Sequence, residues 1–187
     1  MSTTSRMSFE EFQKLQDAAE ETVRYELDEG ALLLTPSQAP RHNIVRYNLR
    51  HALTTFVKTC RLGLVLDETD FRLSENTVRK PDVAFIAKER MKYFDFDRSP
   101  IAGAPSLAIE IISPTNRTQD TTKKVRQYLA AGCQSVWLVY PGLSLVEIHD
   151  AGGSHSITSP QSIDEQKLFP GRAFSLSLTA VFGDDLP

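Results

Sequence analysis

The sequence contains few cysteines and no long apolar run. Cys60 and Cys133 are its only cysteines, and each stands alone in its segment. Neither a disulfide framework nor a cysteine-based metal site is therefore expected, and burial as small apolar residues is the simpler interpretation. No apolar stretch approaches the roughly 20 residues of a membrane-spanning helix. The N-terminal segment lacks the apolar centre of a signal peptide. We therefore expect a soluble protein of a reducing compartment, the cytoplasm.

Repeats and low-complexity segments are also missing from the sequence. Its 187 residues are 41% hydrophobic and 24% charged, which is the composition of one folded unit with a packed core rather than of a disordered chain. The net charge of −3 argues against attraction of the whole surface to nucleic acid. It still leaves room for a local basic patch.

Aspartate and glutamate are absent between positions 31 and 66. The same segment holds the basic residues Arg41, Arg46, Arg50, Lys58 and Arg61. Apolar residues recur at helical spacing from about 42 to 59, which predicts an amphipathic helix there. His42, Arg46 and Arg50 are four residues apart and share another face of this helix. That face is either a solvated surface or a stripe that contacts phosphates, and His42 either contacts a phosphate or caps the helix.

Local patterns predict the elements on either side of that helix. Ser8 and Glu11 form a capping-box pattern that opens a helix over about 8–19. A hairpin that turns at 28–30 follows, so an N-terminal helix and hairpin occupy 8–35. The run 63–74 is predicted to be one long or bent strand.

Apolar runs at 80–88, 106–114 and 135–141 predict three further strands. Residues 89–93, between the first two runs, are expected to form at most a helical turn. Asn116 is predicted to cap a helix that ends at Gly132. The alternating segment 143–150 is expected to pair antiparallel with the strand before it, and short strands follow over 151–187, where "FPGRAFSLSL" is expected to pack back as an edge segment. A strand–helix–strand unit with continuous apolar runs predicts an α/β fold with a mixed sheet covered by helices on both faces. We expect one domain over 1–187 with its core at about 42–150.

Two carboxylates interrupt the apolar strands. Asp82 begins the run "DVAFI", and Glu110 lies inside "LAIEII". Neither has a basic residue on its own face of the strand, and an unpaired buried carboxylate is costly. Two acids on adjacent strands could share a divalent cation, for which magnesium is suited. Alternatively, Asp82 accepts hydrogen bonds at a strand entrance and Glu110 pairs with a distant arginine.

The helix after the second carboxylate supplies a lysine. Asp120, Lys124 and Tyr128 are four apart and form one row beside the apolar face. Lys124 could reach Glu110 and stabilise charge on a phosphate, or it could form an exposed ion pair with Asp120. Lys123 lies about 100° around the helix and is better placed for solvent.

Five motifs in this order resemble the Uma-two family of restriction-endonuclease-like proteins, within the PD-(D/E)XK nuclease superfamily. They are "RYELDEG", "PRHN", "KPDVAFI", "LAIEIISP" and "RTQDTTKKVRQYLAAGCQSVWLVYP", and the resemblance covers roughly residues 8–150. The resemblance implies a core of a helix, a three-stranded meander, a helix and a strand. It also implies that Asp82 is the "PD" acid and that Glu110 is the second acid.

The resemblance extends to two further site residues. It suggests that Glu26 contributes an acid, although the alternation around Glu26 also fits a solvent-facing hairpin residue. Where the superfamily has a lysine two positions after the second acid, this chain has Ile112. The family is similar in placing a lysine on the following helix, which corresponds to Lys124.

The residue patterns and the family resemblance together predict a magnesium-dependent endonuclease that hydrolyses DNA with a metal-activated water. Asp82, Glu110 and the carbonyl of Ile111 are expected to bind Mg²⁺, which Mn²⁺ could replace. Lys124 and Glu26 would assist the reaction. The predicted DNA contacts are His42, Arg46 and Arg50. No organic cofactor and no membrane partner is expected, and a homodimer is plausible by superfamily analogy. The alternative is a catalytically inactive nuclease fold that acts as a binding or regulatory protein.

Overall fold

The structure is a computed structural model that describes residues 6–19, 24–35, 37–114 and 116–183. The last four residues of the predicted C-terminal segment, 184–187, lie outside the described part. Among the described residues, no helix combines the length and the apolar character needed to cross a membrane.

A six-stranded mixed sheet forms the centre of the molecule, in the order β11-β10-β9-β8-β6-β3. Its strands are β3 (Gly63–Asp67), β6 (Val83–Ala87), β8 (Leu107–Ile111), β9 (Ser135–Tyr140), β10 (Leu145–Asp150) and β11 (Gly153–Thr158). Strands β8 and β9 run parallel, and each other neighbouring pair described in this sheet is antiparallel. The predicted mixed sheet and the antiparallel pairing of 143–150 are confirmed.

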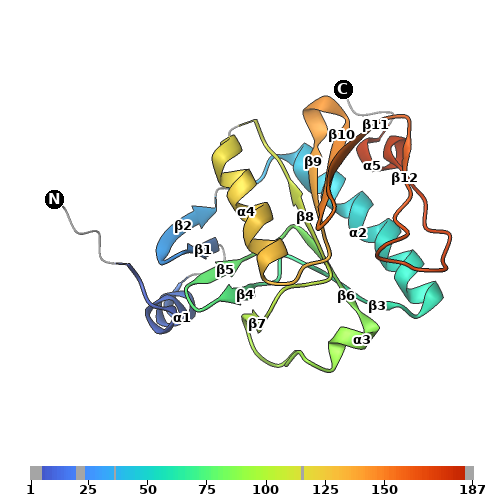
Figure 1. Cartoon of the computed structure of the whole chain (residues 1–187). Helices are drawn as coiled ribbons and strands as arrows, with labels where there is room; N and C mark the ends of the chain where they lie inside the picture. Colours follow the sequence, from blue (N-terminus) through green and yellow to red (C-terminus); the bar gives the residue numbers. More distant parts are fainter. Residues whose placement is uncertain (1–5, 20–23, 36, 115, 184–187) are drawn as a thin grey trace.

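Two helices cover opposite faces of this sheet (Figure 1). They are α2 (Pro40–Cys60) and α4 (Thr118–Ala130). Val45, Leu49 and Leu53 of α2 pack into the larger core cluster, which includes Trp137. On the other face, Val125 belongs to a separate cluster under α4. Strands β3, β6 and β8 form an antiparallel meander, and α4 then crosses over to the parallel strand β9.

A second sheet of five strands lies beside the first, in the order β2-β1-β5-β4-β7. Its strands are β1 (Arg24–Asp28), β2 (Ala31–Thr35), β4 (Phe71–Ser74), β5 (Thr77–Arg79) and β7 (Ile101–Ala102). The predicted hairpin is present as β1 and β2. The helix α1 (Phe9–Ala18) packs Phe12 against Leu27 and Val78 of this sheet. The capping box between Ser8 and Glu11 is confirmed.

Two local predictions between positions 63 and 117 were wrong. The run 63–74 is two strands in different sheets, β3 and β4, because the chain turns at Glu68 with a φ of 46°. Asn116 does not cap α4: the N-cap residue is Arg117, which makes no side-chain cap, and the Asn116 side chain accepts a hydrogen bond from the Ser113 amide at 2.7 Å. The helical turn expected near 89–93 is α3 (Lys88–Met91).

The C-terminal segment packs onto the α2 side of the core. It contains η1 (Pro141–Leu143) before β10, then β12 (Ser162–Ile163), β13 (Leu176–Ser177) and α5 (Leu178–Phe182) after β11. The rings of Phe169 and Phe174 contact Phe56 of α2 at 5.1 and 4.9 Å between centroids. β13 pairs with β12 in a separate two-stranded sheet, so "FPGRAFSLSL" does not form an edge of the central sheet as predicted.

Candidate active site

Asp82 and Glu110 lie side by side where β6 and β8 meet. The antiparallel register pairs Val83 with Ile109, so one step further places Asp82 opposite Glu110. Residues directly opposite in an antiparallel pair point to the same face of the sheet. Both side chains line a cavity of about 120 Å³, here called the acidic cavity. The acids from two separate segments of the chain therefore converge, as the sequence predicts.

Lys124 extends from α4 into the acidic cavity. Its Nζ lies 3.1 Å from Glu110 Oε2 and 3.0 Å from Glu26 Oε1. Lys123 points elsewhere and pairs with Asp28 at 2.9 Å and with Glu29 at 3.1 Å. Of the two adjacent lysines, Lys124 is thus the one at the acids, and it is held there by buried carboxylates rather than exposed beside Asp120.

Glu26 reaches the cavity from the second sheet. It is buried, with 5% of its surface exposed, so the alternative of a solvent-facing hairpin residue is wrong. One carboxylate oxygen accepts a hydrogen bond from the Lys80 amide at 3.1 Å, two residues before Asp82. The other oxygen pairs with Arg79 at 3.0 Å. Because β1 pairs with β5, the hairpin brings this acid to the end of β6.

Arg79 was not predicted from the sequence, yet it organises this side of the cavity. It is 1% exposed. Its guanidinium contacts Glu26 at 3.0 Å, Asp28 at 2.8 Å and the side-chain oxygen of Gln127 at 2.8 Å. Glu26 is 53 residues away from Arg79 in the chain, so no local spacing in the sequence connects these two residues.

Tyr128 is a further residue that the prediction left without a role at the site. Its buried hydroxyl donates a hydrogen bond to Glu110 Oε1 at 2.8 Å. The signal for it was the four-residue spacing from Lys124, which places both side chains on one row of α4. Lys124 and Tyr128 each donate a hydrogen bond to a different carboxylate oxygen of Glu110.

His42 faces Asp82 inside the cavity. Its Nε2 lies 3.2 Å from Asp82 Oδ1, and Asp82 Oδ2 accepts a hydrogen bond from the Ile111 amide at 2.7 Å. The alternative that His42 caps α2 is wrong, because the N-cap residue is Ala39 and no side chain caps it. A contact between His42 and a phosphate stays a prediction.

The other predicted DNA contacts are engaged within the chain. Arg46 forms an ion pair with Glu68, and Arg50 forms one with Asp67 at 3.2 Å. Arg50 and Asp67 are about half-exposed, so this pair is open to solvent and to ligands. Nucleic-acid binding by this helix face stays a prediction.

Burial and neighbouring charges shift the pKa values of Glu110 and Lys124 in the acidic cavity. Burial raises the pKa of Glu110 to about 7; Lys124 opposes this rise, and the negative charges of Glu26 and Asp82 add to it. Burial by itself would lower the pKa of Lys124, but Glu110 and Glu26 raise it above its ordinary value. Lys124 is therefore a permanent cation at neutral pH, suited to stabilising negative charge and unsuited to accepting a proton.

The residues present fit a hard divalent cation. Asp82, Glu110 and Ile111 line the acidic cavity, where two carboxylates and a main-chain carbonyl are the available oxygen ligands. Burial is the main cause of the raised Glu110 pKa, and the negative charges of Glu26 and Asp82 add to it. Among the described residues no group of three or more His, Cys, Asp or Glu side chains is arranged to hold a metal. Magnesium is commonly bound by only one or two carboxylates and keeps several waters, so two acids and a carbonyl suit it.

The fold and the site define a restriction-endonuclease-like protein, with acids on adjacent meander strands and a lysine on the crossover helix. The chain belongs to the Uma2 family, described as "Putative restriction endonuclease", which it matches over residues 9–180. The fold is similar to that of a crystal structure described as a "putative nuclease belonging to DUF820" from Anabaena variabilis ATCC 29413. That match has a TM-score of 0.78 and 22% identity, and it covers 94% of this chain and 97% of the other. No curated protein matches the chain.

Proposed function

We propose that this protein is a magnesium-dependent endonuclease that hydrolyses phosphodiester bonds in DNA. The observation that supports it most is the convergence of Asp82, Glu110 and Lys124, from three separate elements, on one small cavity. Membership of a family described as "Putative restriction endonuclease" agrees with this activity. Such a cavity, with Asp82, Glu110 and the partly buried ammonium of Lys124, suits a reaction in which negative charge develops on a phosphate.

Each residue has a role that its contacts support. Asp82, Glu110 and the carbonyl of Ile111 would hold Mg²⁺, and Mn²⁺ could take its place. When bound, the ion would polarise a phosphate oxygen and make water more acidic. Lys124, fixed between Glu26 and Glu110, would steady the charge that develops on the phosphate. His42 orients Asp82, and Arg79 holds Glu26 so that Glu26 can hold Lys124. Arg46 and Arg50 would contact the DNA backbone at the rim.

A non-catalytic binding role is the second candidate function. The observation that favours it is that both oxygens of Glu110 and both oxygens of Asp82 already have partners within the protein. A carboxylate oxygen has two lone pairs, however, so each of them can still accept one more ligand. Assays of DNA cleavage separate the two functions.

The test is nicking of supercoiled plasmid in magnesium or manganese. Wild-type protein should convert the supercoiled form to open circles, and Asp82→Ala, Glu110→Ala and Lys124→Ala should each lower the rate by about 100-fold or more, the loss typical of removing one charge-stabilising group. Lys123→Ala is the matched control, because it removes the neighbouring lysine outside the cavity, and it should retain the wild-type rate. The proposal fails if wild-type protein does not nick in either metal, or if Asp82→Ala prepared in the same way nicks equally well.

A further inference from the structure

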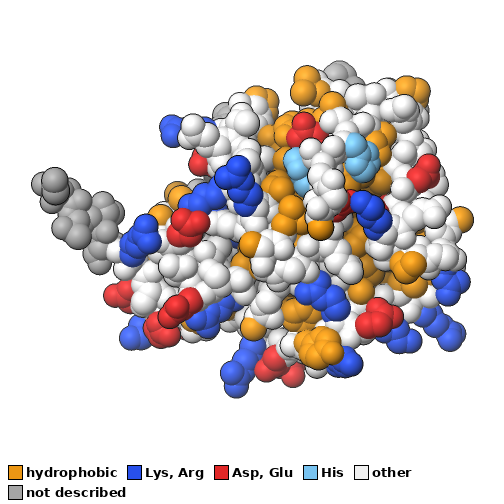
Figure 2. Space-filling model, in the orientation of Figure 1, with side chains coloured by type: hydrophobic (Ala, Val, Ile, Leu, Met, Phe, Trp, Pro, Cys, Tyr) orange, Lys and Arg blue, Asp and Glu red, His pale blue; other side chains and the backbone are white. Residues whose placement is uncertain are grey.

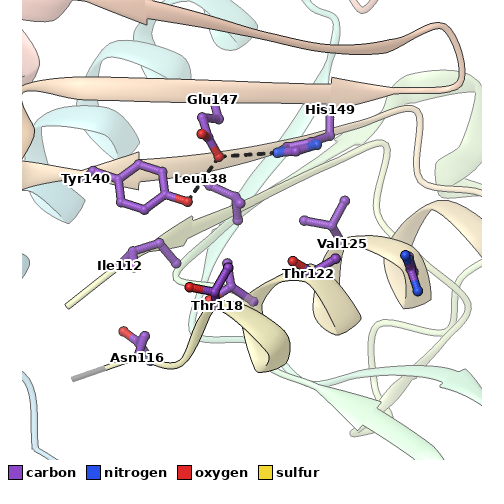
Figure 3. A pocket seen from close by; sticks show the side chains of 11 residues that line it. Ile112, Asn116, Thr118, Thr122, Val125, Leu138, Tyr140, Glu147 and His149 are labelled. Atoms are coloured by element: carbon purple, nitrogen blue, oxygen red, sulfur yellow. Dashed lines mark hydrogen bonds and ion pairs between the residues drawn. The ribbon is translucent and has the colours of Figure 1, made fainter. Parts of the chain in front are cut away.

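A larger groove opens next to the acidic cavity, between α4 and strands β9 and β10. It has a volume of about 350 Å³, within the range of small-ligand sites. Figure 3 shows side chains from the helix and from the strands pointing toward each other across it. Hydrophobic side chains are exposed between α4 and the β10–β11 hairpin, with histidine side chains beside them (Figure 2). We call it the α4–β10 groove.

The groove has an apolar interior and a polar rim. Ile112, Val125 and Leu138 supply apolar surface, and the ring of Tyr140 lines one end (Figure 3). The polar side chains that line it are Asn116, Thr118, Thr121, Thr122, Arg126, Glu147 and His149. A flat aromatic ligand with hydrogen-bonding edges matches this combination, because its faces can pack on apolar and aromatic groups while its edges meet polar ones.

One end of the groove has unused hydrogen-bonding capacity. The Tyr140 hydroxyl donates to Glu147 Oε2 at 3.0 Å. His149 Nε2 lies 3.6 Å from the same oxygen, which is within ion-pair distance but too long for a hydrogen bond, and this buried nitrogen has no hydrogen-bond partner among the described residues. Because buried polar atoms normally form a hydrogen bond, this nitrogen points to a ligand that would supply one.

The groove adjoins the acidic cavity. Ile112, Asn116 and Thr121 line both. A ligand that fills the groove is therefore next to whatever occupies the cavity. In a nucleotide, one sugar joins the base to the phosphate. Two adjoining sites of this kind can therefore hold the base and the phosphate of the same nucleotide.

We propose that the α4–β10 groove receives one unpaired nucleobase of the DNA strand whose phosphate occupies the acidic cavity. This inference rests on the proposed nuclease function and specifies its substrate, which is single-stranded or locally unpaired DNA. A base inside a duplex is stacked and has its hydrogen-bonding edge engaged, so it cannot enter a pocket of this kind without leaving the helix. Stacking of an unpaired base on Tyr140 would add to its affinity.

The test fills the groove with a bulky side chain from α4 and leaves Tyr140, Glu147 and His149 at its polar end unchanged. Thr122 and Thr118 are exposed positions of α4 that line the groove, so Thr122→Trp and Thr118→Trp are compatible with the fold. Gln119→Trp is the matched control, since Gln119 is exposed on the same helix outside the groove. Binding of a fluorescein-labelled single strand and of a hairpin duplex of the same sequence is measured by anisotropy in EDTA at fixed low salt, and melting temperatures verify folding.

Wild-type protein should bind the single strand about tenfold more tightly than the duplex, and either groove-filling variant should lose about that factor, the equivalent of one base–aromatic stack. Gln119→Trp should bind the single strand as tightly as wild-type protein does. Equal binding of both DNAs, no binding of either, or unchanged binding by both groove-filling variants overturns the groove assignment.

Cleavage of the same two DNAs in manganese distinguishes this inference from the proposed function. Single-strand preference without cleavage by wild-type protein rejects the nuclease and leaves a nucleobase site. Cleavage of both DNAs at equal rates by wild-type protein and Thr122→Trp keeps the nuclease and rejects the nucleobase site.

Discussion

At the scale of single residues, the site depends on charges that are buried together and must be matched by partners. Arg79 illustrates this best, because its guanidinium faces two carboxylates and an amide while almost none of its surface reaches water. Removing one member of a buried ion pair leaves the other charge uncompensated, which costs far more than removing an exposed pair. The same substitution at two arginines can therefore measure what burial contributes.

Arg79→Met should destabilise the protein by about 3–5 kcal/mol, because it leaves Glu26 and Asp28 buried without their cation. Arg50→Met is the matched control: it removes an arginine from an ion pair that is 48% and 40% exposed, and it should cost less than about 1 kcal/mol. Urea denaturation followed by circular dichroism gives both values. Similar losses for the two variants would contradict the role assigned to Arg79.

Glu110 should make the stability of the metal-free protein depend on pH. Its pKa is raised from 4.5 to about 7 by burial and by neighbouring acids. Between these values the folded protein holds a proton that the unfolded chain has released. The free energy of unfolding must therefore fall as pH rises from about 4.5 to 7, and it should become flat again above that window. The opposite shift of Glu26, whose pKa is lowered, acts below this window.

The measurement for this prediction is urea denaturation in EDTA at pH 5, 6, 7 and 8. Wild-type protein should lose roughly 2–3 kcal/mol between pH 5 and 8, the size expected when the pKa of a group rises from 4.5 to about 7 on folding. Glu110→Gln carries no titrating group at this position and should show a smaller slope. Parallel curves for the two proteins would mean that Glu110 titrates in its ordinary range.

At the scale of elements, the sequence predicted what local periodicity determines. The apolar spacing over 42–59 corresponds to α2, and the apolar runs correspond to β6, β8 and β9 within a few residues. The division of 63–74 into two strands was missed because the chain turns at Glu68, which has a positive φ without the glycine or proline that usually marks such a turn.

At the site, too, local patterns in the sequence predicted some residues and missed those that depend on long-range contacts. Asp82 and Glu110 were predictable because a carboxylate in an apolar strand conflicts with its surroundings. Lys124 followed from its position beside the apolar face of the next helix and from the resemblance, whereas Glu26 rested mainly on the resemblance. The Arg79 network was not predictable, because it joins β5 to β1 and α4 across long stretches of chain. The groove beside the cavity depends on how α4 lies against β10, which no sequence period encodes.

Gly63 shows how closely β3 approaches its neighbour. It begins β3 with a φ of 147°, and a Cβ at this position would lie 2.0 Å from the Ile86 carbonyl oxygen and 2.9 Å from the Lys88 amide. Gly63→Ala should therefore push β3 away from β6 and destabilise the protein by at least about 1–3 kcal/mol, the cost of a residue forced into a sparsely populated backbone region.

Gly142→Ala provides the comparison for this strand contact. A Cβ on Gly142 would meet no atom within 4 Å, and its φ is not among the positive ones. This substitution should change the melting temperature little or raise it slightly. If both alanine variants melt at the wild-type temperature, the close contact between β3 and β6 is wrong.

At the scale of the whole molecule, both sheets contribute carboxylates to the acidic cavity. The central sheet supplies Asp82 and Glu110, while the second sheet supplies Glu26 through its first strand. Burial raises the pKa of Glu110, and the charges of Glu26 and Asp82 add to this rise, while Lys124 opposes it only in part. A cavity of this kind lowers the stability of the empty protein, as functional sites often do, and gains stability when a cation enters.

Magnesium should therefore stabilise the folded protein through the acidic cavity. At a concentration about ten times the dissociation constant, binding to the folded state alone contributes about 1.4 kcal/mol, which corresponds to a rise in melting temperature of about 3–5 °C for a chain of this size. Asp82→Ala should lose this rise, while Asp97→Ala, which removes an exposed acid from the surface, should keep it. Differential scanning fluorimetry in EDTA and in increasing magnesium gives the comparison. An equal rise in wild-type protein and Asp82→Ala would show that the ion binds elsewhere, and the proposed metal site at Asp82 and Glu110 would then be rejected.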